Sequence, residues 1–136
     1  MISYIKKCRT CDEIKPLDEF YRSNKKSNPD GRINYCKGCR EKTNRRSYLK
    51  RKFGITPEDY ESMLESQGGG CAICGRLDGL HSCGDKGTTY YGSRFAIDHC
   101  HETGVIRGLL CMNCNTALGC FQDNIARLEK AIEYLQ

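Results

Sequence analysis

The residues best suited to chemistry lie in one short stretch, Asp98-His99-Cys100-His101, with Asn115 following downstream. Carboxylate and amide oxygens are hard ligands that suit Mg2+. Imidazole titrates near neutral pH and can therefore accept a proton from water while remaining mostly neutral. Together, these carboxylate, amide and imidazole side chains could support metal-assisted hydrolysis. Taken alone, Asp98-His99 fits equally well a surface turn beside a structural metal, in a protein that binds DNA and cuts nothing.

The cysteines give a clearer pattern. Eight of the eleven form four Cys-x-x-Cys pairs, and the pairs combine into two sets of four. The first set is Cys8, Cys11, Cys36 and Cys39, and the second is Cys71, Cys74, Cys111 and Cys114. Two such pairs complete a tetrahedral thiolate site for Zn2+. We therefore predict two structural zinc sites, with disulfides or free core thiols as the alternative.

The remaining cysteines, Cys83, Cys100 and Cys120, fall outside this scheme. Cys100 lies between two histidines, and His81 and Cys83 occupy a glycine-rich polar stretch. We predict no third metal site from these residues, because a lone His or Cys in such a stretch is more often exposed or buried without a ligand role.

Charge is distributed unevenly along the chain. Residues 1–52 contain 16 Lys plus Arg against 6 Asp plus Glu, whereas residues 53–136 contain 6 against 11. The two parts carry +10 and −5, and this asymmetry favours a polyanionic partner for the first. We predict DNA contacts by a basic helix, through Arg45, Arg46, Lys50, Arg51 and Lys52, and also through Arg107. The alternative is a solvated basic face with no partner.

The pattern of turns, caps and apolar residues predicts an α+β fold in three parts. Residues 1–41 should form a four-cysteine zinc ribbon, 42–56 a basic linker helix, and 57–136 a core containing the second four-cysteine site. Thr56-Pro57 begins a helix that stops before Gly68. Within the core, 95–99 and 105–110 read as short strands. Helical patterns follow from Asn115 and over 123–134.

Two segments in this core carry a family resemblance: residues 97–104 (IDHCHETG) and 105–115 (VIRGLLCMNCN). They closely resemble the recombination endonuclease VII family of His-Me finger nucleases, and the likeness extends over about residues 52–135. The N-terminal ribbon is similar to one that often precedes this core in small phage and bacterial members. The resemblance implies a zinc-stapled ββα-metal core.

The resemblance also implies roles for individual residues. Asp98 and Asn115 would hold a catalytic Mg2+ or Mn2+, and His99 would be the general base. His101 would assist at the phosphate or support the loop, and Arg107 would contact phosphate or serve structurally. Neighbouring strand residues point to opposite faces, so a backbone distortion must bring Asp98 and His99 to one metal. Leu118 stands where some members have Glu.

These features predict a metal-dependent DNA endonuclease. The runner-up is a non-catalytic DNA-binding or regulatory module, and an RNA binder ranks last because no aromatic platform is evident. The start of the sequence has no apolar stretch of signal-peptide length, and no run is long enough for a membrane span. We expect a cytoplasmic protein of a bacterial cell, encoded by the bacterium or by a phage. The founding member of the family acts as a dimer, and a homodimer is one arrangement that the resemblance allows.

Overall fold

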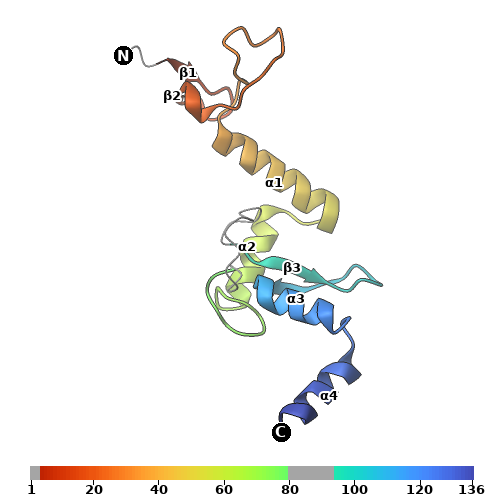
Figure 1. Cartoon of the computed structure of the whole chain (residues 1–136). Helices are drawn as coiled ribbons and strands as arrows, with labels where there is room; N and C mark the ends of the chain where they lie inside the picture. Colours follow the sequence, from red (N-terminus) through yellow and green to blue (C-terminus); the bar gives the residue numbers. More distant parts are fainter. Residues whose placement is uncertain (1–3, 80–93) are drawn as a thin grey trace. The chain divides into compact units, whose positions relative to one another are not determined.

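The structure is a computed structural model that describes residues 4–79 and 94–136 of the 136-residue chain (Figure 1). The chain divides into two compact units, Met1–Pro57 and Glu58–Gln136. Small sheets and helices alternate along it, which confirms the predicted α+β class. In the described part of the chain, no helix combines the length and apolar character that crossing a membrane requires.

The first unit is a small ribbon followed by a long helix. Strands β1 (Ile5–Lys7) and β2 (Ile14–Pro16) pair antiparallel, and the short helix η1 (Leu17–Glu19) follows. Phe20 is fully buried between Cys8 and Cys36, so an aromatic side chain and the cysteines make this core together. In a chain with few apolar residues, metal bound at such a cluster would stabilise the fold.

Helix α1 spans Lys37–Phe53 and begins five residues earlier than the predicted linker helix. Cys36 is its N-cap residue, so the last cysteine pair of the ribbon forms the first turn of the helix. Gly54 ends α1 in a left-handed conformation, φ 72°, and its N–H donates to the Lys50 carbonyl. The cationic residues of the last turn, Lys50, Arg51 and Lys52, suit the negative end of the helix dipole.

The second unit is built around a β-hairpin flanked by helices. Helix α2 (Pro57–Ser66) comes first, and strands β3 (Ala96–His99) and β4 (Ile106–Leu110) then pair antiparallel. Helix α3 (Met112–Cys120) packs against both strands and completes a ββα arrangement. Helix α4 (Ile125–Leu135) begins two residues later than the predicted 123, because Gln122 and Asp123 both adopt left-handed backbone.

Two long-range side chains hold α2 to this hairpin. The buried Tyr60 donates its hydroxyl to the Phe95 carbonyl at 3.0 Å. Gln67 pairs with the backbone of Leu109 in both directions, donating to its carbonyl at 2.9 Å and accepting from its N–H at 2.8 Å. Leu109 and Leu110 lie in the core beneath these contacts. The hairpin that carries Asp98 and His99 is therefore fixed from one side by α2.

Candidate active site

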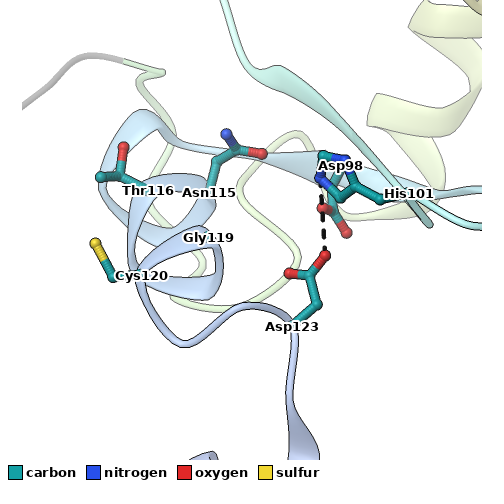
Figure 2. Close-up of a pocket in the computed structure, with 7 residues that line it drawn as sticks. All are labelled: Asp98, His101, Asn115, Thr116, Gly119, Cys120 and Asp123. Carbon is teal, nitrogen blue, oxygen red and sulfur yellow. Dashed lines mark ion pairs between the residues drawn. The ribbon is translucent and has the colours of Figure 1, made fainter.

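A hollow of about 440 Å³ opens between the hairpin, α3 and the turn that leads to α4 (Figure 2). We call it the Asp98 hollow. It is lined by Asp98, His101, Asn115, Thr116, Gly119, Cys120 and Asp123. Residues far apart in sequence therefore surround one polar space, and the predicted metal ligands Asp98 and Asn115 are both among them.

The hairpin is irregular at the step between Asp98 and His99. Asp98 lies opposite Gly108, but His99 lies opposite Ile106, so Arg107 is the extra residue of a β-bulge. A bulge re-aims side chains that a regular strand would send to opposite faces. The distortion that the resemblance required thus occurs at the expected step.

Asp98 is buried, with 8% of its surface exposed, and its carboxylate pairs with Arg107. Arg107 Nε lies 2.7 Å from Asp98 Oδ2, and Arg107 Nη2 lies 2.9 Å from Asp98 Oδ1. This two-point geometry is the strong form of a guanidinium–carboxylate bond. Asp98 first, and Asp123 second, raise the pKa of Arg107 above its usual range. Arg107, predicted as a DNA contact, is thus tied to the candidate metal ligand.

Asp123 is a lining residue that the sequence did not indicate. Its Oδ2 lies 3.0 Å from Arg107 Nη2. The same oxygen lies 3.8 Å from His101 Nε2, and Figure 2 marks this ion pair. Nothing in the local sequence marks it, because it belongs to no motif and meets Arg107 only after the chain has turned through α3. Its backbone is left-handed, φ 52°, as is that of the preceding Gln122, φ 56°.

The two histidines occupy different places. His101 lines the Asp98 hollow, and its side chain is 76% exposed. His99 is half-buried and is not among the lining residues, but its ring centroid lies 5.0 Å from that of His101. The structure therefore groups Asp98, His101 and Asn115 directly around the space, with His99 beside them.

Asn115 is placed by the second cysteine cluster. Cys111 is the N-cap residue of α3, and the Asn115 N–H donates to the Cys111 carbonyl at 3.0 Å in the first turn. In Figure 2 the Asn115 side chain points along the hollow toward Asp98 and His101. Because Cys114 and Asn115 are adjacent, the cysteine cluster fixes the start of the helix that presents the amide.

Both predicted sets of four cysteines form clusters. In each, the four Sγ atoms lie within 4.8 Å of one another. A tetrahedral Zn2+ with Zn–S bonds of about 2.3 Å requires sulfurs about 3.8 Å apart. Cys74 and Cys111 are 3.7 Å apart, and Cys11 and Cys36 are 4.0 Å apart, so the donor sets fit this ion. The fit indicates closed scaffold sites with no position left for substrate.

The two clusters share one backbone plan. In the first, the Asp12 N–H donates to the Cys8 carbonyl and the Cys8 N–H to the Glu13 carbonyl. In the second, the Gly75 N–H donates to the Cys71 carbonyl and the Cys71 N–H to the Arg76 carbonyl. Asp12 and Gly75, the residues after each first pair, are both left-handed. Each second pair then starts a helix.

In this backbone arrangement, N–H groups donate hydrogen bonds to the sulfur of the first cysteine in each cluster. Desolvation tends to raise the pKa of Cys8, but N–H groups of Cys11, Cys36 and Thr10 outweigh it and lower that pKa to about 6. Cys71 behaves alike: desolvation opposes ionisation, yet N–H groups of Cys74, Cys111 and Ile73 lower its pKa to about 6. Stabilised thiolates are the form that binds metal.

Comparison with known proteins shows the family of this chain. The family model described as recombination endonuclease VII matches residues 46–136, more than half of the chain. The chain belongs to the recombination endonuclease VII family.

Curated relatives of this endonuclease VII family member include the Gene 59 proteins of two mycobacterial phages. The protein of Mycobacterium phage D29 is 39% identical over 101 residues, which cover 74% of this chain and 54% of the relative. The protein of Mycobacterium phage L5 is 38% identical over 98 residues, covering 71% and 53%. The chain thus spans about half the length of the curated relatives it matches.

A solved structure is also similar, that of the beta-beta-alpha-Me type II restriction endonuclease Hpy99I. It is 29% identical, and the alignment covers 96% of this chain and 64% of that chain, with a TM-score of 0.38. A TM-score this low does not establish a common arrangement of the elements.

The remaining predicted site residues are distributed as follows. Arg46, Lys50, Arg51 and Lys52 are exposed on α1, and Arg45 is partly exposed. Lys52 also lies over the Phe53 ring, 5.1 Å from its centroid. Cys100 and Cys120 belong to neither four-cysteine cluster, and His81 and Cys83 lie outside the described residues.

Proposed function

We propose that this member of the endonuclease VII family is a metal-dependent DNA endonuclease. One observation carries the proposal: the family match includes Asp98 and Asn115, and these two hard oxygen donors line a single hollow beside two histidines. We further propose that Asp98 and Asn115 hold Mg2+ or Mn2+ there, and that the two cysteine clusters hold structural zinc.

The chemistry of the site's own residues supports hydrolysis. His99 takes the proton of the attacking water, for which a neutral imidazole is suited at physiological pH. His101, which faces the hollow and solvent, donates a hydrogen bond to a phosphate or leaving oxygen. Arg107 supplies positive charge next to the same space. When bound, the divalent ion supplies Lewis acidity that stabilises charge on the phosphate and on the leaving oxygen.

The first unit supports a role in substrate binding. It carries a net charge of +10, while the second unit carries −5. The exposed cations of α1 neutralise DNA phosphates and release counterions, which strengthens binding without reading sequence. We propose that the protein acts in the bacterial cytoplasm, because its relatives include proteins of the mycobacterial phages D29 and L5.

Cleavage of supercoiled plasmid tests the proposal. Wild type should nick or linearise the plasmid when Mg2+ or Mn2+ is added, and Asp98→Ala should not. A wild-type protein that cuts under neither metal would contradict the proposal. Chelators are a poorer test, because they also remove zinc and unfold the chain.

The second candidate is a DNA-binding module without catalysis, and the +10 charge of the first unit favours it. It predicts binding that weakens steeply with salt and no cleavage under any metal. Mapping cleavage on a random-sequence duplex library and on a four-way junction separates the two candidates. The same maps show whether the enzyme prefers a duplex site or a branched structure.

A further inference from the structure

Asp123 occupies an unusual place beside the Asp98 hollow. It lies in the turn between α3 and α4, where both Asp123 and Gln122 adopt left-handed backbone, φ 52° and 56°. Residues other than glycine adopt this conformation at a cost, and the surrounding structure must enforce it. The Asp123 N–H donates to the Leu118 carbonyl at 3.0 Å, which holds the turn against the end of α3.

The turn aims one carboxylate oxygen at two cationic or potentially cationic side chains. Asp123 Oδ2 lies 3.0 Å from Arg107 Nη2 and 3.8 Å from His101 Nε2. The Asp123 side chain is 21% exposed, so its bond to Arg107 is partly shielded from water. Arg107 Nη2 therefore donates to both carboxylates, Asp123 and Asp98, and also to the His99 carbonyl at 3.3 Å.

This sharing matters because Asp98 is the proposed ligand of the divalent ion. A guanidinium and a divalent cation compete for the same carboxylate oxygens, and they also repel each other. If Asp98 were the sole partner of Arg107, its bidentate bond would oppose metal binding. Asp123 offers Arg107 a second anion, so the guanidinium can leave Asp98 without leaving the hollow. Arg107 Nη1 makes no hydrogen bond with any described residue, so it remains free to receive a phosphate oxygen.

We infer that Asp123 is a positioning residue, which draws Arg107 away from Asp98 when a divalent ion binds and keeps its guanidinium at the hollow for the DNA phosphate. This inference rests on the proposed function for the identity of the metal site and of the substrate. Asp123 itself does not contact the ion: it acts through Arg107.

A double-mutant cycle on Mn2+ binding tests the inference without requiring cleavage. Asp123→Asn removes the charge but keeps the shape, and Asn tolerates left-handed backbone, so the turn is retained. Free Mn2+ is measured by electron paramagnetic resonance in zinc-loaded protein, with Asp98→Ala as the baseline for binding outside the hollow. Asp123→Asn should raise the Mn2+ Kd about fivefold or more, because Arg107 then competes with the ion unopposed.

The second arm identifies the route of the effect. In an Arg107→Ala background, Asp123→Asn should leave the Mn2+ Kd unchanged, because no guanidinium remains to be positioned. A rise of the same size in both backgrounds would overturn the inference, since Asp123 would then act on the ion directly. No rise in either background would overturn it as well. Gln122→Asn, at the neighbouring left-handed residue, should leave the Kd unchanged.

Kinetics extend the test to the DNA. Asp123→Asn should lower kcat at saturating Mn2+ by about tenfold, while KM changes little, because Arg107 is misplaced at the scissile phosphate and not at the distant phosphates that dominate binding. If wild type and Asp123→Asn cleave equally well, the inference about Asp123 is wrong but the proposed function stands. If wild type does not cleave but the Mn2+ cycle behaves as described, the proposed function fails alone.

Discussion

Arg107 shows how one residue connects a backbone irregularity to the chemistry of a site. It is the extra residue of the bulge opposite the Asp98–His99 step, and its side chain returns to the Asp98 carboxylate. Asp98 is buried, and a buried carboxylate needs a charged or hydrogen-bonding partner. Arg107 therefore both distorts the strand and supplies the positive charge that neutralises Asp98.

At the residue scale, substitution of His99 and substitution of His101 should lower the cleavage rate by different amounts. His99→Ala removes the proposed base and should lower kcat by about 10²- to 10⁴-fold, with little change in DNA affinity. His101→Ala should cost less, because His101 is largely exposed and only assists at the phosphate. Single-turnover cleavage of a fluorescent duplex measures both. If His101→Ala lost more activity than His99→Ala, the two roles would have to be exchanged.

Gly75 makes a second prediction at this scale, and it concerns stability. Gly75 has φ 71° and occupies the place that Asp12 occupies in the other cluster. Gly75→Ala should lower the free energy of unfolding by about 1 kcal/mol, because Ala resists left-handed backbone. Gly75→Asn should cost less, since Asn tolerates that region. Urea unfolding in zinc-saturated buffer compares the two, and equal losses would rule out a backbone cause.

At the element scale, the hairpin depends on α2 through Gln67. Its side chain bonds both backbone groups of Leu109 as well as the Gly70 carbonyl at 2.9 Å. A Cβ placed on Gly108 would meet Gln67 Oε1 at 2.9 Å, so a larger residue there would displace the Gln67 amide. The Gln67 amide thus makes the two hydrogen bonds with Leu109 that a neighbouring strand would make.

Removing this contact should loosen the hairpin. Gln67→Ala leaves the Leu109 N–H without its partner, whereas the Leu109 carbonyl keeps the Ala72 N–H at 3.0 Å. The change should cost about 1–3 kcal/mol of unfolding free energy. Glu65→Ala, an exposed change in the last turn of α2 just before Gln67, is the matched control and should cost little. Thermal unfolding gives the comparison. Equal melting temperatures for the two variants would show that Gln67 does not support β4.

The elements also show what the sequence could and could not predict. Cysteine spacing located both clusters, and the motif that includes Asp98, His101 and Asn115 located three lining residues, because each signal lies within a short segment. Gln67 was missed because its partner Leu109 lies 42 residues away and no local pattern joins them. Asp123 was missed for a related reason: its role arises from a turn of two left-handed residues, and neither is glycine. The assigned roles of His99 and Asn115 remain predictions.

At the scale of the whole molecule, each unit has its own thiolate cluster, and the two should be separable. Cys11→Ser should reduce the bound zinc from two ions to one and unfold the first unit. The second unit should keep its hairpin, because its cluster shares no residue with the first. Zinc content by mass spectrometry and amide exchange by unit measure this. Loss of protection in both units would show that they fold as one.

Charge leads to a further prediction at this scale. Lys50→Gln on α1 should weaken DNA binding and reduce the slope of log K against log salt by about one, as expected for a single lost phosphate contact. Lys130→Gln, an exposed change in the acidic second unit, is the control and should leave the slope unchanged. Fluorescence anisotropy over a salt series provides both slopes. Identical slopes for the two variants would exclude α1 from the DNA contact.

The opposite charges of the two units have a consequence for turnover. The unit that contains the Asp98 hollow carries −5 and by itself repels a polyanion, whereas the unit carrying +10 attracts it. If the first unit binds DNA as proposed, covalent attachment makes the encounter of that DNA with the hollow intramolecular and raises its effective concentration there. Changes in α1 should therefore alter the DNA concentration needed for half-maximal cleavage and leave the rate at saturation unchanged.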